Sequence, residues 1–97
     1  MAVKIMLERE FKEDPTVEDL MKIKEFRIGA MRYKGYFHGE TLVDSENHRK
    51  IIVISAWDNI DSWREWENSD NRRNLAAELQ EKLKTPPTTR FLILGSI

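Results

Sequence analysis

Residues 3–11 alternate between apolar and charged side chains, which is the period-two pattern of a strand with one buried face. Arg9 falls on the apolar side of this predicted strand. Its apolar neighbours on that side are Val3, Ile5, Leu7 and Phe11. A guanidinium group in this position either pairs with a carboxylate or holds an anionic or phenolate oxygen of a ligand.

A helix is predicted from Val17 to about Arg32. Asp14-Pro15 ends the first strand, and Thr16 followed by Asp19 is a typical N-cap pair. The main apolar stripe of this helix comprises Val17, Leu20, Met21, Ile28 and Met31, and a second side carries Ile23, Phe26 and Ala30. Because one sheet contact cannot cover both sides, we expect an additional surface to cover the rest.

Two further strands, 36–43 and 48–57, are predicted to form a hairpin, because the polar residues 44–47 separate them. Residues 51–54 are consecutive β-branched apolar residues, and the last predicted strand, 90–94, is also apolar on both faces. Strands of this kind are covered on both sides.

Between these strands we predict a helix in two pieces. Ser62 and Glu65 suggest a capping box for a short helix that bears Trp63 and Trp66. A longer helix follows Ser69-Asp70 and ends before Pro86-Pro87. Its apolar positions are Leu75, Ala76, Leu79 and Leu83.

The predicted order is βαββαβ in a single domain spanning residues 1–97. It is typical of the ferredoxin-like α+β fold, a four-stranded antiparallel sheet with helices on one face and, here, the second helix broken in two. The other sheet face would expose apolar side chains, so we expect two copies to pack these faces together as a homodimer.

Composition narrows the function. Sixteen Lys and Arg against seventeen Asp and Glu give a formal charge of −1, which does not favour nucleic acid as a partner. The chain has no cysteine, and charge appears too early for a signal peptide, so we expect a cytoplasmic protein. No apolar run is long enough to span a membrane. We expect no metal site, because only two histidines, His38 and His48, are present.

The stretch 53–69 joins the end of a strand, at Trp57, through a polar turn to Trp66 nine residues later, and Ser69 follows shortly after. With the order and length of the elements, this stretch resembles the antibiotic biosynthesis monooxygenase superfamily of dimeric α+β barrels. The resemblance covers essentially the whole chain. It implies a cofactor-independent oxygenase of polyketide aromatics or quinols, or a haem-degrading enzyme.

The haem-degrading branch resembles this chain only at Trp66. That branch uses an Asn on the first strand and a His ten residues after the Trp, and these positions fall at Arg9 and Ala76 here. Alanine cannot ligate iron, so we expect no haem degradation.

Six residues are candidates for a site. We predict His38 as a general base and Arg9 as an anion-stabilising group. Trp66, Phe26, Ile23 and Trp63 are predicted to contact a small hydrophobic or aromatic ligand, although aromatic residues at helical spacing also fit a core. His48 lies beside a turn, where solvent exposure is expected.

Two functions remain open. The first is a cofactor-free monooxygenase acting on an electron-rich phenol, quinol or anthrone, which reduces dioxygen as its anion. The second is a non-catalytic dimeric module that binds a hydrophobic ligand. A cavity with an ionisable group facing Trp66 favours the first, and a cavity filled by the aromatic residues themselves favours the second.

Overall fold

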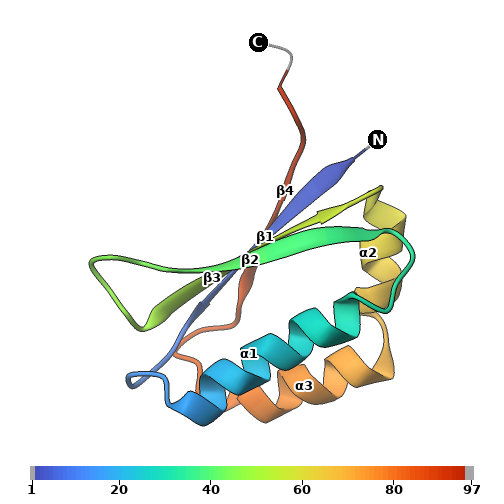
Figure 1. Ribbon diagram of the computed structural model, residues 1–97. Helices are drawn as coiled ribbons and strands as arrows, with labels where there is room; N and C mark the ends of the chain where they lie inside the picture. Colours follow the sequence, from blue (N-terminus) through green and yellow to red (C-terminus); the bar gives the residue numbers. More distant parts are fainter. Residues whose placement is uncertain (1, 96–97) are drawn as a thin grey trace.

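The computed structural model describes residues 2–95 of the 97-residue chain (Figure 1). Four strands and three helices follow one another in the predicted order, which confirms the ferredoxin-like α+β fold and the divided second helix. The elements are β1 (Val3–Glu10), α1 (Val17–Ala30), β2 (Tyr36–Val43), β3 (Lys50–Trp57), α2 (Ile60–Glu67), α3 (Asp70–Gln80) and β4 (Thr88–Leu92).

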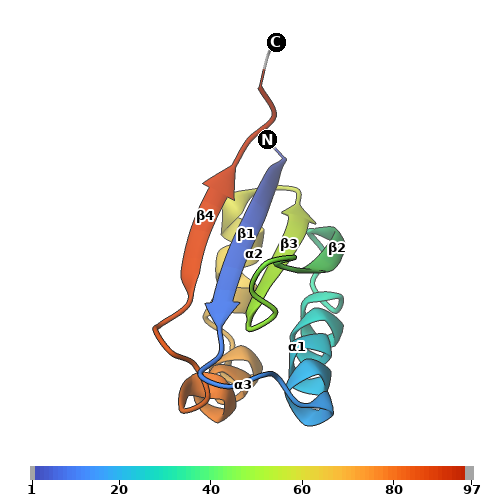
Figure 2. The same ribbon diagram turned by 90° about the vertical axis from the view of Figure 1, so that its left-hand side faces the viewer.

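The strands form one antiparallel sheet in the order β2-β3-β1-β4, which Figure 2 shows from β4 on one side to β2 on the other. The register pairs Val3 with Trp57 and Arg9 with Ile51. Because side chains alternate along a strand, the odd-numbered residues of β1 face the helices and the even-numbered ones face the opposite side. Arg9 therefore lies among the core positions, as the sequence pattern predicts.

The core lies between the sheet and the helix layer (Figure 1). Trp57 is fully buried at the end of β3, and its indole Nε1 donates to Ser55 Oγ over 2.9 Å. Tyr36 packs edge-on against Trp57 with ring centroids 5.3 Å apart. This packing agrees with a structural role for Trp57 at the corner between strand and helix.

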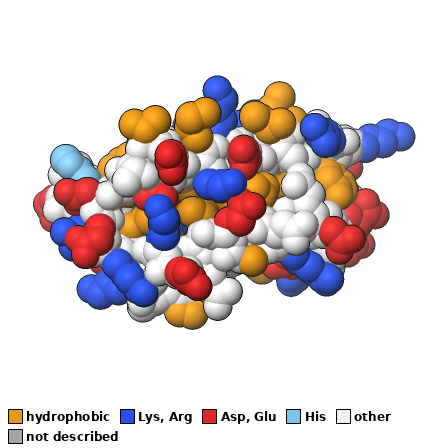
Figure 3. All heavy atoms as spheres, turned by 90° about the horizontal axis from the view of Figure 1, so that it is seen from below, with side chains coloured by type: hydrophobic (Ala, Val, Ile, Leu, Met, Phe, Trp, Pro, Cys, Tyr) orange, Lys and Arg blue, Asp and Glu red, His pale blue; other side chains and the backbone are white. Residues whose placement is uncertain are grey.

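Helix α1 presents a different side to the sheet from the one its main stripe predicts. Ile23, Phe26 and Ala30 are buried, whereas Val17 is 74% exposed and Met31 is 61% exposed. The stripe prediction was therefore wrong, because the smaller apolar set is the one that packs on the sheet. Figure 3 views the molecule from the side on which α1 and α3 lie, and apolar side chains there are mixed with charges of both signs.

The helix starts follow local side-chain caps. Thr16 and Asp19 form the predicted capping box at α1, with Thr16 N donating to Asp19 Oδ2 over 2.9 Å and Asp19 N donating to Thr16 Oγ1 over 3.1 Å. The predicted cap at Ser62 was wrong. Asn59 caps α2 by accepting from the backbone N–H of Ser62 over 2.9 Å, because the helix starts one turn earlier at Ile60.

The helices of residues 2–95 all lie on one face of the sheet, and none of them covers the second face (Figure 1). Met6, Ile52 and Ile54 lie on it half-buried, and Lys50 and Glu8 form an ion pair of 3.8 Å across it. Strand β4 ends at Leu92, so the prediction that residues 93 and 94 continue it was wrong. Within residues 2–95, none of the helices combines the length and the apolar character needed to cross a membrane.

Candidate functional site

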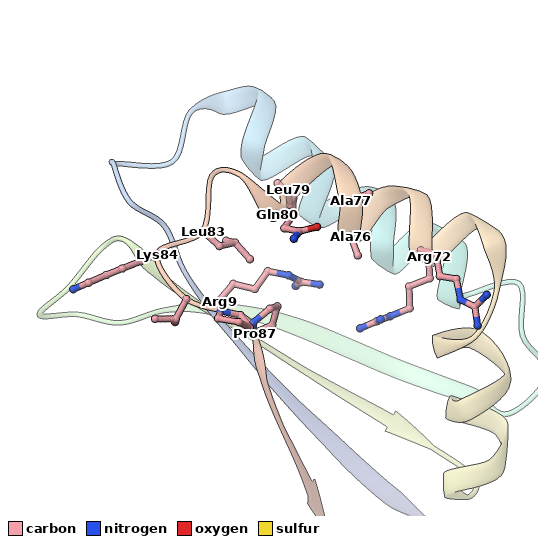
Figure 4. Close-up of a pocket in the computed structure, with 12 residues that line it drawn as sticks. Arg9, Arg72, Ala76, Ala77, Leu79, Gln80, Leu83, Lys84 and Pro87 are labelled. Carbon is pink, nitrogen blue, oxygen red and sulfur yellow. The ribbon is translucent and has the colours of Figure 1, made fainter.

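A cavity lies between α3, the end of β1 and the segment that leads into β4 (Figure 4). Its volume is about 500 Å³, which is within the range of small-molecule sites. Backbone hydrogen bonds hold the segment after α3 against the end of β1. Lys84 N donates to Glu10 O over 2.8 Å, and Lys12 N donates to Lys82 O over 2.9 Å. The apolar wall of the cavity is formed by Ala76, Ala77, Leu79, Leu83, Pro86 and Pro87.

Arg9 extends from β1 along this cavity beneath α3 (Figure 4). Its residue is only 4% exposed, and its guanidinium carbon lies 4.2 Å from the centre of the Phe26 ring. Within residues 2–95, no carboxylate lies within ion-pair distance of Arg9, so the salt bridge considered from the sequence is not formed. Burial, with a smaller contribution from the positive charge of Arg72, lowers the pKa of Arg9 to about 9. Arg9 therefore still carries its charge at neutral pH.

Arg72 is the second cation of the site and comes from the first turn of α3. Its guanidinium carbon lies 5.7 Å from the centre of the Phe26 ring and 5.8 Å from that of Trp63. Burial lowers the pKa of Arg72, and the charge of Glu67 partly opposes this effect. Glu67 pairs with Arg64 over 2.9 Å, and no ion pair joins Glu67 to Arg72 within residues 2–95.

The cavity is strongly basic at its polar positions. Arg73 and Lys84 join Arg9 and Arg72 in lining it, and no acidic residue lines it. Lys84 lies 3.8 Å from Glu10, which also accepts a hydrogen bond from Asn47. Since the chain as a whole has slightly more acidic than basic residues, this concentration of positive charge is specific to the cavity.

The predicted aromatic contacts surround a second, much smaller space. Phe26, Trp63 and Trp66 line a cavity of about 50 Å³, which shares Arg9 and Arg72 with the larger one. Trp66 is 4% exposed and packs on Gly29, where a Cβ atom would overlap its ring. Ile23 is buried in the core and lines neither cavity. The aromatic residues thus form the inner wall behind the two arginines.

The structure does not bring His38 together with the other predicted site residues. His38 pairs with Ala56 and is exposed on the sheet face that the helices leave uncovered. His48 is exposed beside the turn before β3, as predicted. Within residues 2–95, no three His, Cys, Asp or Glu side chains gather in a group that could hold a metal ion.

Comparison with known proteins assigns the chain to a family. The family model described as antibiotic biosynthesis monooxygenase matches residues 5–78, which is most of the chain. The chain belongs to the antibiotic biosynthesis monooxygenase family. A search of curated proteins with this sequence found no match.

Solved structures share the fold of this antibiotic biosynthesis monooxygenase family member at low identity. SnoaB from Streptomyces nogalater, a cofactor-independent oxygenase, is 12% identical with a TM-score of 0.86, over 99% of this chain and 95% of SnoaB. Rv0793 from Mycobacterium tuberculosis is 11% identical with a TM-score of 0.86, over 100% of this chain and 98% of that one. A conserved protein from Methanosarcina mazei Go1 is 15% identical with a TM-score of 0.85, over 95% and 91%.

Two positions that the sequence resemblance to haem-degrading enzymes singles out lie together in the structure. Arg9 and Ala76 both line the larger cavity, and Trp66 lines the smaller one beside it. Sequence reasoning found Arg9 but missed Arg72 and Lys84. The sequence holds no signal for Arg72, because arginines in a first turn that also carries Asp70 are equally compatible with an ordinary solvent-exposed turn.

Proposed function

We propose that this protein is a cofactor-independent monooxygenase that oxidises a small electron-rich aromatic compound in the cavity beneath α3. The main support is Arg9, a buried cation without an ion-pair partner among residues 2–95, set beside an apolar cavity of about 500 Å³. The family and the fold shared with SnoaB agree with this proposal. The aromatic ring of the substrate lies against the apolar wall, and Arg9 binds its ionised oxygen.

Arg9 promotes the reaction by stabilising the anion of the substrate. A guanidinium in a site of low dielectric favours a phenolate or enolate over the neutral form, and the released proton leaves to water at the cavity mouth. No imidazole lines the cavity, so the lowered pKa of the bound substrate takes the place of a strong base. His38, the predicted base, lies on the other face of the sheet and has no role in this step.

The substrate anion then reduces dioxygen directly. One electron passes from the anion to dioxygen, and the substrate radical and superoxide combine to form a C–O bond. After the distal oxygen takes up a proton, the O–O bond breaks as the same carbon loses its remaining proton, which gives a C=O group and water. For an anthrone-type substrate, a CH₂ group and O₂ thus become a ketone and H₂O.

A homodimer is part of the proposal. Met6, Ile52 and Ile54 on the uncovered sheet face, with Leu42 43% exposed and Leu92 37% exposed at its edges, form an apolar surface that a second copy would bury. The two sheets would then form the dimeric α+β barrel. A cytoplasmic location remains the expectation for this protein.

Dioxygen uptake tests the proposal. The purified protein is mixed with a quinol and with an anthrone, and consumption is followed at pH 7 beside the variants Arg9→Met and Arg32→Met. We expect uptake by the wild type, a loss of at least about tenfold for Arg9→Met, and no change for Arg32→Met, because Arg32 is exposed and lines neither cavity. Tight binding of these compounds without any dioxygen uptake would instead identify a non-catalytic module that binds a hydrophobic ligand. The small volume of the cavity around Trp66, about 50 Å³, favours this alternative.

A further inference from the structure

The cavity carries more positive charge than one phenolate can neutralise. Arg9 lies deepest, and Arg72, Arg73 and Lys84 line the same space from α3 and the segment after it. Within residues 2–95, no ion pair reaches Arg72 or Arg73, and the single contact of Lys84 with Glu10 is 3.8 Å long. A single ionised oxygen held by Arg9 leaves Arg72 and Arg73 without an anionic partner among residues 2–95.

The position of the two arginines of α3 adds to this imbalance. Arg72 and Arg73 occupy the first turn of the helix, where the helix dipole is positive. The backbone N–H groups of both residues are already bound, to Ser69 Oγ over 3.2 Å and to Ser69 O over 3.1 Å. Their side chains, rather than the backbone of the turn, are therefore the groups available to an anion in the cavity.

We propose that the natural ligand of this cavity is an aromatic acid, a ring that bears a carboxylate in addition to the hydroxyl or keto group that Arg9 binds. The carboxylate is bound by Arg72 and Arg73, since a guanidinium presents parallel N–H groups that match the two oxygens of a carboxylate. The ring occupies the apolar part of the cavity against Leu83, Pro86 and Pro87. This inference names the substrate class of the proposed oxygenase and rests on that function only for the identity of the reacting group.

Equilibrium binding without turnover tests the inference. The probes are 6-hydroxy-2-naphthoic acid, its primary amide and inorganic phosphate, titrated anaerobically at pH 7 with calorimetry as the readout. The proteins are the wild type, Arg72→Met, Arg73→Gln and the control Arg32→Met. We expect the wild type and Arg32→Met to bind the acid at least tenfold more tightly than the amide, and both α3 variants to lose most of this preference.

Several results would overturn the inference. The first is equal affinity for the acid and the amide, and the second is no binding of either compound. The third is an affinity for phosphate equal to that for the acid, because this would identify a site for a free oxyanion. A shift of Arg73→Gln toward monomer in sedimentation, with its preference for the acid unchanged, would show that these arginines pair with a carboxylate of a second copy. This test can be separated from that of the proposed function. Dioxygen uptake with a neutral quinol, without any preference for the acid, would support the oxygenase function and reject the aromatic acid as ligand. A preference for the acid without dioxygen uptake would support the aromatic acid as ligand and reject the oxygenase function.

Discussion

Replacing Arg9 by methionine should stabilise the protein when no ligand is bound. Methionine keeps the length and apolar character of the side chain, and it removes a charge that is buried without a carboxylate partner in residues 2–95. The guanidinium has lost hydration on folding without gaining an ion pair. Its removal therefore eliminates this desolvation penalty and breaks no ion pair within residues 2–95.

The magnitude follows from the pKa of Arg9. The decrease of this pKa from the ordinary value of an arginine to about 9 corresponds to roughly 5 kcal/mol, at about 1.36 kcal/mol for each pKa unit. The variant also loses the contact between Arg9 and the Phe26 ring, which contributes about 0.5–2 kcal/mol. The two effects together set an upper limit of roughly 3–4.5 kcal/mol. We expect Arg9→Met to raise the free energy of unfolding by about 1–4 kcal/mol, the range known for replacing buried ionic groups by apolar side chains.

Urea unfolding at pH 7 measures this difference, with Arg32→Met as the control that should stay within about 0.5 kcal/mol of the wild type. The difference also depends on pH. Because the pKa of Arg9 is lowered in the folded state, the unfolded chain binds more protons between pH 9 and 12, so the wild type gains stability there relative to the variant. The difference in the free energy of unfolding between Arg9→Met and the wild type should therefore narrow above about pH 9. A destabilisation of more than about 1 kcal/mol at pH 7 would refute the reasoning, because it would show that Arg9 has a stabilising partner.

Three other predictions follow from the site and the helix caps. The affinity for an aromatic acid that carries a keto group and no hydroxyl should stay constant from pH 6 to 8 and fall above about pH 9, as Arg9 loses its proton. Arg72, Arg73 and Lys84 are the other charged groups that line the cavity, Glu67 acts on Arg72 from outside it, and Glu10 pairs with Lys84. Fluorescence titration would contradict this if the affinity held at pH 10.5. Gly29→Ala should shift the emission of the tryptophans and lower stability by about 1–3 kcal/mol, because the new Cβ displaces Trp66, and an unchanged spectrum would argue against the close packing. Asn59→Ala should cost about 1 kcal/mol in urea unfolding and Ser62→Ala clearly less, since Asn59 caps α2; the reverse order would restore the cap first predicted at Ser62.

The fold was predictable because its signals are local. Alternation in residues 3–11 and the Thr16–Asp19 capping box each mark an element boundary without reference to the rest of the chain. The helix end predicted from Pro86-Pro87 was wrong, because α3 already ends at Gln80 and Leu83 instead pairs with Phe11 in an isolated β-bridge. Predictions failed where two local signals compete. Helix α1 has apolar residues on two sides, and only packing on the sheet decides that Phe26 is buried and Met31 is exposed.

The candidate site was predictable only in part, since a cavity depends on residues far apart in sequence. Arg9 could be found because a charge interrupts an apolar strand face. Arg72 and Lys84 join it only through the packing of α3 and the turn at Lys84 against β1, which no spacing in the sequence reveals. His38 was predicted because histidine is the residue type that most often transfers protons near neutral pH, and the register shift between Tyr36 and His38 helps to set which face of the sheet it occupies.

The ionisation of a bound phenol tests most directly whether Arg9 stabilises a substrate anion. The probe is 4-nitrophenol, whose phenolate absorbs visible light, titrated between pH 5 and 8, where Arg9 remains charged. The wild type should lower the pKa of the bound phenol by at least about one unit, and Arg9→Met should abolish this effect. A bound phenol whose pKa equals or exceeds that of the free compound would contradict the anion-stabilising role of the cavity.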